Sequence, residues 1–117
     1  MRNRRASDAP AYYIAVTLYE SSSPAQNYLP LYEECFVLIQ ATSLEEAEEK
    51  ALVHAKNAEA RFQNEEGEEI TWLLKHIVDV SPAATEEFKD GVDLYVRHFR
   101  DYEAYKTFEP LLSEQDL

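Results

Sequence analysis

Residues 43–62 read SLEEAEEKALVHAKNAEARF, and this is the longest stretch of the sequence in which apolar residues recur at helical spacing. Ser43 followed by Glu46 fits a capping box, in which the serine hydroxyl and the glutamate carboxylate satisfy free amides of the first turn. Glutamates come first and lysines later, as the helix dipole favours. The apolar stripe consists of Leu44, Ala47, Ala51, Ala55, Ala58 and Phe62. The sequence therefore predicts a helix over residues 43–62 whose alanine side packs closely on a sheet, with its acidic residues as a solvated outer face.

Four segments around this helix have the composition of β-strands, with β-branched and aromatic residues bounded by turn formers. They are residues 11–20, 31–41, 69–80 and 92–100. Asn64 and Gly67 favour a turn after the helix. Tyr102, Tyr105, Phe108 and Leu112 recur at steps of three and four, which predicts a short last helix that breaks near Pro110.

The predicted element order is ββαββα, which belongs to the α+β class. A right-handed crossover through the helix leaves a gap between the second and third strands that the fourth strand fills. This gives the sheet order 1-2-4-3, antiparallel throughout, a circularly permuted ferredoxin-like arrangement. One long helix covers one face, and a short helix ends the chain.

The 117 residues suit one domain. We expect residues 11–112 to form it, with a disordered basic leader over residues 1–10 and a frayed tail over residues 113–117.

The chain is strongly acidic, with a net charge of -12. The first ten residues hold three arginines and one aspartate, so the rest of the chain carries 8 basic and 22 acidic residues. Such a body repels phosphate backbones and anionic lipids, which argues against nucleic-acid and membrane-surface partners. A basic protein partner is compatible with it.

Cys35 is the single cysteine, so no internal disulfide is expected, and its apolar neighbours predict a buried thiol. No apolar run reaches the roughly 18 residues of a membrane span, and residues 1–10 lack the apolar centre of a signal peptide. These features predict a cytoplasmic protein.

Several short segments make the chain similar to a known family. They are Tyr12-Tyr13-Ile14-Ala15-Val16, Glu34 before Val37-Leu38-Ile39, Ala41-Thr42-Ser43 before Glu46-Ala47, and Asn64, Gly67, Trp72, Ile77, Asp79-Val80, Gly91 and Leu94-Tyr95. On these segments the chain resembles domain-of-unknown-function family 4288, small bacterial domains of similar length. The resemblance spans about residues 11–100. It implies no established activity, substrate or catalytic residue.

The candidate chemical groups are sparse. His54, His76 and His98 would converge only if the third and fourth strands paired in a particular register, and their spacing matches no metal motif, so we interpret them as packed histidines. Gly67 and Gly91 are the only glycines, which leaves no phosphate-binding loop. Acidic pairs such as Glu33-Glu34 and Asp90-Asp93 are interpreted as solvated. We therefore expect no enzyme, metal or cofactor.

The sheet is apolar on both faces. Tyr12, Ile14, Val16 and Leu18 are expected beneath the long helix. The predicted opposite face consists of Tyr13, Ala15, Tyr19, Phe36, Leu38, Leu73, Ile77, Tyr95 and Phe99. Such a face is larger than a small soluble monomer normally exposes. Either the C-terminal helix or a second subunit can cover it, and a homodimer is favoured because one short helix covers only part of four strands.

These observations predict a non-enzymatic interaction domain that self-associates through this face and binds a protein partner. The partner is expected to be basic, as for an immunity or antitoxin protein. The alternative is a small-ligand-binding domain, or a minor enzyme, with the aromatic face as its pocket.

Overall fold

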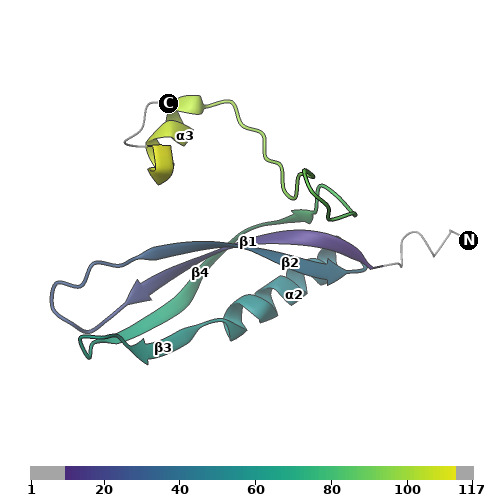
Figure 1. Ribbon diagram of the computed structural model, residues 1–117. Helices are drawn as coiled ribbons and strands as arrows, with labels where there is room; N and C mark the ends of the chain where they lie inside the picture. The colour runs from purple at the N-terminus through teal and green to yellow at the C-terminus, as the bar shows by residue number, and fades with distance from the viewer. Residues whose placement is uncertain (1–9, 113–117) are drawn as a thin grey trace, which may run out of the picture.

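The computed structural model describes residues 10–112, which form a twisted sheet with a long helix on one side and a C-terminal segment above the other (Figure 1). The elements are β1 (Ala11–Ser22), β2 (Tyr32–Ala41), α2 (Leu44–Asn57), β3 (Ala60–Gln63), β4 (Glu69–Pro82), α3 (Tyr102–Phe108) and η1 (Pro110–Leu112). The α+β class, the four-stranded antiparallel sheet and the ββαββα order are confirmed. The predicted leader, apart from Pro10, and the predicted tail lie outside the described residues.

The strand order is β2-β1-β4-β3, so the predicted order 1-2-4-3 is wrong. β1 pairs with both β2 and β4 and occupies the centre of the sheet, as suits a strand that is apolar on both faces. β2 and β3 lie at opposite edges and run antiparallel to each other. The right-handed crossover rule applies to parallel strands, so it does not govern the path of α2.

The third strand was missed because it lies inside the predicted helix. α2 ends at Asn57 rather than Phe62, and residues 60–63 form β3, which pairs with the start of β4. The side chain of Asn64 accepts the amides of Glu66 (3.0 Å) and Glu68 (2.9 Å), and Gly67 adopts a positive φ of 81°. This local turn makes residues 60–72 a hairpin, which competes with continuation of the helix.

Residues 92–100 do not form the predicted fourth strand. β4 already pairs with β1 on one side and with β3 on the other, so neither of its edges is free for another strand. These residues instead leave the sheet as an irregular segment that leads to α3 (Figure 1).

The helix start is confirmed. The Ser43 hydroxyl accepts the Glu46 amide at 3.0 Å. The Glu46 carboxylate accepts the Thr42 amide at 2.6 Å and the Thr42 hydroxyl at 2.8 Å, one residue earlier than in the usual capping box. All three contacts join residues at most four positions apart, so the sequence alone was enough to predict a helix start at Ser43 and Glu46.

The core lies between the sheet and α2. Its cluster of buried side chains consists of Tyr13, Ala15, Ile39, Ala41, Ala47 and Ala51. The predicted faces of β1 are therefore inverted, with Tyr13, Ala15 and Tyr19 beneath α2 and Ile14 and Val16 on the other side. Alternation separates the two faces of a strand, but it does not say which one a helix covers when both are apolar.

Candidate interaction surface

The sheet face away from α2 carries a row of apolar side chains, which we call the far face. It consists of Ile14, Val16, Leu18, Phe36, Leu38, Leu73 and Val78, as the strand register and burial indicate. Ile14 and Val16 are buried, whereas Phe36 is 57%, Leu38 52%, Leu73 49% and Val78 43% exposed. The structure therefore leaves one end of β1 covered and the flanking strands open.

Three of the eight predicted interface residues lie on the far face, namely Phe36, Leu38 and Leu73. The prediction was wrong for Tyr13, Ala15 and Tyr19, which are at most 9% exposed beneath α2. Ile77 also lies on the α2 side, since it pairs with Thr17. Tyr95 and Phe99 belong to the C-terminal segment rather than to a strand.

Val78 was missed because β4 does not alternate regularly. A register shift between Val16 and Thr17 leaves Val78 outside the pairing, and both Val78 and Asp79 have contacts on the far face. Strict alternation assigns such neighbours to opposite faces. No residue type in this stretch signals the bulge in advance.

Residues 92–112, which we call the C-terminal arm, are anchored to the far face through Tyr95. Its phenol donates to Asp79 Oδ2 at 2.7 Å, and its ring packs edge-on against Phe36 at 5.4 Å between centroids. The guanidinium of Arg97 lies 6.0 Å from the centre of the same ring. Burial, followed by the hydrogen bond to Asp79, raises the pKa of Tyr95 above its ordinary value. The anchor fixes where the arm leaves the sheet.

Beyond this anchor the arm stands above the far face and does not lie flat on it (Figure 1). α3 is capped by Asp101, which accepts the Ala104 amide at 3.0 Å, but none of its residues is buried. Phe99 stacks on Tyr105 at 4.9 Å between centroids. Tyr102 is 57% and Phe108 68% exposed. The predicted short helix is thus present, but it does not close over its own sheet.

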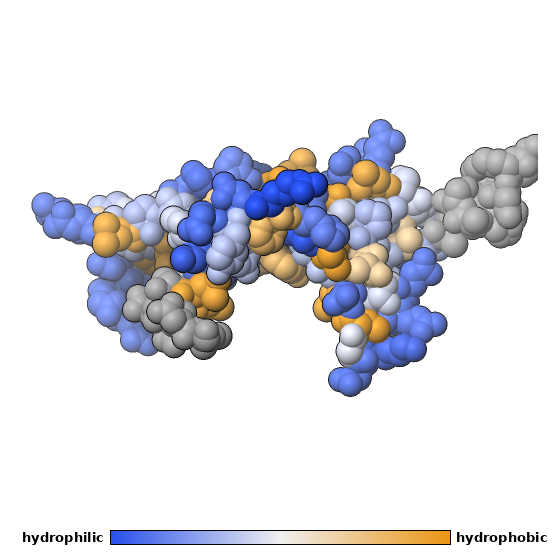
Figure 2. Space-filling model, turned by 90° about the horizontal axis from the view of Figure 1, so that it is seen from above, coloured by the Kyte–Doolittle hydropathy of each residue, from blue (hydrophilic) through white to orange (hydrophobic). Residues whose placement is uncertain are grey.

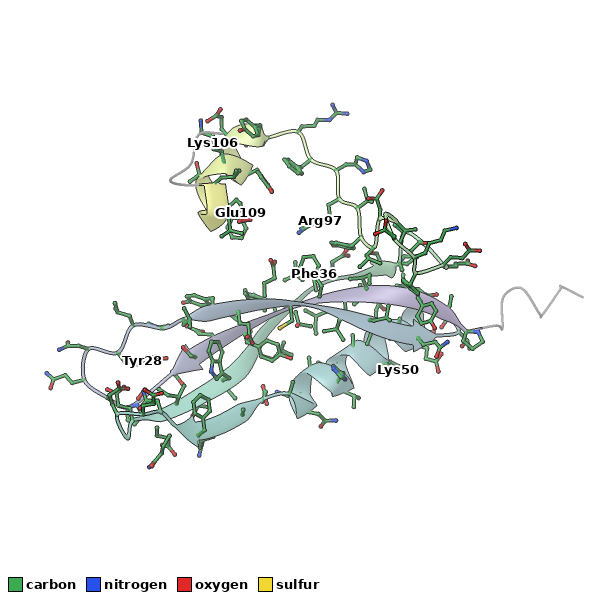
Figure 3. All side chains as sticks on the ribbon, in the orientation of Figure 1. Tyr28, Phe36, Lys50, Arg97, Lys106 and Glu109 are labelled. Carbon is green, nitrogen blue, oxygen red and sulfur yellow. The ribbon has the colours of Figure 1, made fainter. Side chains whose placement is uncertain are left out.

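A groove of about 740 Å³ separates the far face from α3. Its apolar lining consists of Phe36, Val78, Tyr95, Phe99, Ala104, Tyr105 and Phe108. Figure 3 shows Phe36 projecting from β2 toward the arm, while Arg97 and Glu109 lie on the arm above it. Viewed from above the arm, hydrophobic side chains reach the surface between hydrophilic ones (Figure 2). The groove is therefore an aromatic surface with a charged rim.

A smaller pocket of about 390 Å³ lies on the opposite side of the sheet, near the end of α2. Its lining includes Tyr19, Glu33, Cys35, His54 and Trp72. Cys35 is half-buried rather than fully buried as predicted, and burial raises the pKa of its thiol. A thiol of raised pKa is a weak nucleophile near neutral pH, which does not favour cysteine catalysis in this pocket.

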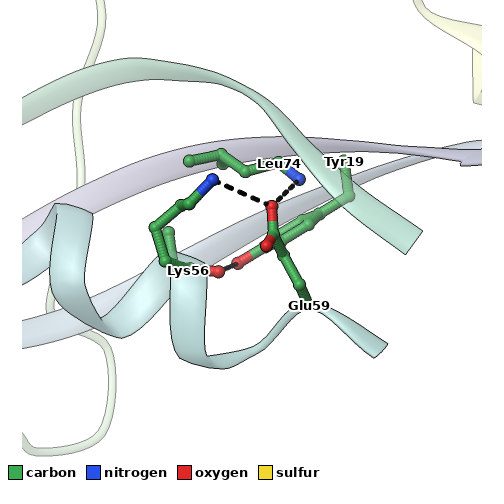
Figure 4. A network of polar contacts seen from close by, with 5 residues as sticks. Tyr19, Lys56, Glu59 and Leu74 are labelled. Atoms are coloured by element: carbon green, nitrogen blue, oxygen red, sulfur yellow. Dashed lines mark hydrogen bonds and ion pairs between the residues drawn. The ribbon is translucent and has the colours of Figure 1, made fainter. Parts of the chain in front are cut away.

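Polar contacts join α2, β1 and β4 beside this pocket (Figure 4). The phenol of Tyr19 donates to the Ala55 carbonyl at 3.0 Å, and burial raises its pKa. Glu59 Oε2 accepts the Leu74 amide at 2.9 Å and pairs with Lys56 at 3.4 Å. The amide of Leu74 holds the pKa of Glu59 below its ordinary value. These contacts fix the end of α2 on the sheet.

The three histidines do not come together. His54 lines the pocket beside α2, and His98 lines the groove. His76 lies on β4, where it pairs with Leu18 of β1. Among residues 10–112 no group of three or more His, Cys, Asp and Glu side chains is placed to hold a metal ion. Within the same residues, no helix is long and apolar enough to cross a membrane.

Comparison with known proteins identifies a family. The family model described as Domain of unknown function (DUF4288) matches residues 12–96. Neither the curated proteins nor the solved structures contain a match to the chain. The matched region includes the Tyr95 anchor and ends before α3, so the sheet, α2 and the start of the arm make up the part shared with the family.

Proposed function

This chain belongs to the DUF4288 family of domains of unknown function, and we propose that it is a non-enzymatic interaction domain that self-associates through its far face. The observation that carries the proposal is the exposure of Phe36, Leu38, Leu73 and Val78, each between 43% and 57%. Exposed apolar patches larger than a few hundred Å² are rare on soluble monomers and mark interaction sites. A second subunit is therefore the simplest cover for this face.

A twofold dimer fits the position of the patch. The same surface on two copies is self-complementary across a twofold axis, and closed dimers of this kind are the commonest oligomers. Cover by the chain's own C-terminal helix is the alternative raised by the sequence. It is disfavoured because α3 leaves Phe36 and Val78 exposed and buries none of its own residues.

The acidity of the body supports a basic protein as an additional partner. Residues 11–91 carry five basic and sixteen acidic side chains. Such a surface steers a basic protein toward it and raises the association rate more than the final affinity. A partner-neutralising role, as in immunity or antitoxin proteins, is the specific form of this proposal. We place it in the cytoplasm as part of the same proposal, since a single cysteine provides no disulfide framework.

The groove favours a second candidate, a small-ligand-binding domain or a minor enzyme. Its 740 Å³ falls within the range of about 300–1,000 Å³ typical of ligand pockets. Tyr95, Phe99 and Tyr105 provide aromatic surfaces for a planar ligand. The two candidates differ in whether the groove stays open to solvent in the assembled protein.

Light scattering of matched leucine variants tests the self-association. The wild-type chain should have twice its 13.5 kDa mass, and Leu38→Asp should return it to 13.5 kDa because it places a charge on the far face. Leu52→Asp is the control, since Leu52 is 49% exposed on α2 and Leu38 is 52% exposed. A 13.5 kDa wild-type particle at high concentration would reject the dimer. Equal effects of the two substitutions would reject the far face as its interface.

Affinity capture from the native host at low and at high salt tests the basic partner. A basic protein should be retained at low ionic strength and released when salt screens the acidic surface. Retention of no basic protein even at low salt would contradict the proposal.

A further inference from the structure

α3 is too short to be stable as an isolated helix. It has seven residues, whereas helices below about 12–15 residues are marginal in water without packing. Its own sheet provides little packing, because no residue of α3 is buried and Phe108 is 68% exposed. The arm therefore ends in an aromatic helix that needs a surface.

We propose that α3 of one copy packs into the groove of a second copy, between that copy's far face and its α3. The second copy's α3 does the same in return, so the two arms are exchanged across a twofold axis. The inference rests on the proposed self-association and adds the element that completes the interface. A twofold axis gives both copies the same contact, so a single dimer covers both α3 helices.

The chemistry of the two surfaces fits this exchange. Phe36 and Val78 line the groove below, and Tyr105 and Phe108 are the aromatic residues that α3 brings to it. Residues 92–112 carry three basic and four acidic side chains, whereas residues 11–91 carry five and sixteen. The arm thus approaches a second acidic body with less repulsion than residues 11–91 do.

The connection to α3 is long enough for the exchange. Tyr95 is fixed to Asp79 and Phe36, so the free part of the arm begins at Val96. Residues 96–101 contain no helix or strand. Six extended residues reach up to about 20 Å, which permits α3 to contact a neighbouring chain while its anchor stays in place.

Cysteine cross-linking of the full-length chain tests the inference. In a Cys35→Ala background, one preparation carries Glu34→Cys and a second, with a different tag, carries Ala104→Cys; both positions line the groove. Each chain then holds one thiol, so every disulfide joins two chains. After mixing and mild oxidation, the heterologous disulfide should form at least about tenfold faster than one between Ala104→Cys and the control Gln63→Cys, because paired groups react at a high effective concentration.

A chain that carries both Glu34→Cys and Ala104→Cys tests whether α3 closes over its own sheet, because such closure would favour an intramolecular disulfide. A mainly intramolecular disulfide in this chain would overturn the exchange. A heterologous rate equal to the Gln63→Cys control would also overturn it. If light scattering still shows a dimer in either case, the far-face association stands and only the arm exchange fails. A monomer at every concentration rejects both.

Discussion

At the scale of single residues, the Glu59 carboxylate, rather than a neighbouring strand, accepts a hydrogen bond from the backbone amide of Leu74. The Leu74 amide lies beside the register shift between Leu18 and Tyr19, and the Glu59 carboxylate is its acceptor. This contact lowers the pKa of Glu59 from 4.5 in the folded state. A carboxylate with a lowered folded pKa adds stability above its unfolded pKa and loses it as the pH falls through the folded value.

Glu59→Gln should therefore lower the urea midpoint at about pH 7, and the difference from wild type should shrink at a more acidic pH, as the wild-type carboxylate takes up a proton. Urea unfolding at the two pH values measures this. Glu48→Gln on the exposed side of α2 is the control and should change neither midpoint appreciably. A constant difference between wild type and Glu59→Gln at both pH values would contradict the assigned role of the charge.

The Ser43 cap gives a second prediction. Ser43→Ala removes the acceptor of the Glu46 amide and should lower the free energy of unfolding by about 1 kcal/mol. Ser22→Ala at the exposed end of β1 is the matched control and should stay within about 0.5 kcal/mol. The measurement is urea unfolding by circular dichroism. Equal losses for the two variants would show that the cap adds nothing beyond a generic serine.

At the scale of elements, the sequence predicted what depends on neighbouring residues. The start of α2 was predictable because Thr42, Ser43 and Glu46 form a local network. The end of α2 was not, because residues 58–62 also have helical spacing and the hairpin at Asn64 decides against it. The covered face of β1 depends on how Tyr19 reaches the Ala55 carbonyl across 36 residues of chain. No local pattern contains that contact.

The candidate site was predicted in part for the same reason. Phe36 and Leu38 alternate regularly with the less exposed Cys35, Val37 and Ile39 on β2, so their face followed from the periodicity. The face of the sheet on which Val78 lies depends on a bulge in β4. The approach of Tyr95 depends on Asp79, which lies sixteen residues earlier. Phe99 and Tyr95 were assigned to a strand because their composition suits one, although β4 has no free edge to receive it.

The arm gives the prediction at this scale. A chain truncated after Val96 keeps every residue of the family match and loses α3. Since no residue of α3 is buried, the truncated monomer should unfold within about 0.5 kcal/mol of the full monomer at concentrations too dilute for dimers. Light scattering at high concentration should show that dimerisation is weakened.

Removal of residues 113–117 alone is the control for this truncation and should preserve the dimer. An unfolded truncated chain would show that α3 belongs to the core. A truncated chain that dimerises as tightly as the full one would show that the far face suffices without the arm.

At the scale of the whole molecule, charge and apolar surface act in opposite directions. The net charge of -12 makes two copies repel, while burial of the exposed far-face side chains would favour the proposed dimer. A basic partner experiences attraction from the same charge. The two proposed associations should therefore differ in how they respond to salt.

Raising sodium chloride from about 0.02 M to about 0.3 M shortens the screening length from roughly 20 Å to below 10 Å. The dimer should tighten, because screening removes repulsion between like-charged bodies and leaves apolar burial unchanged. Binding of a basic protein should weaken over the same range, because screening removes attraction. Analytical ultracentrifugation measures the dissociation constant of the dimer. Titration calorimetry measures the dissociation constant of the complex with the captured basic partner. A dimer that dissociates as salt rises would mean that ion pairs hold it together, and the far face would lose its place as the interface.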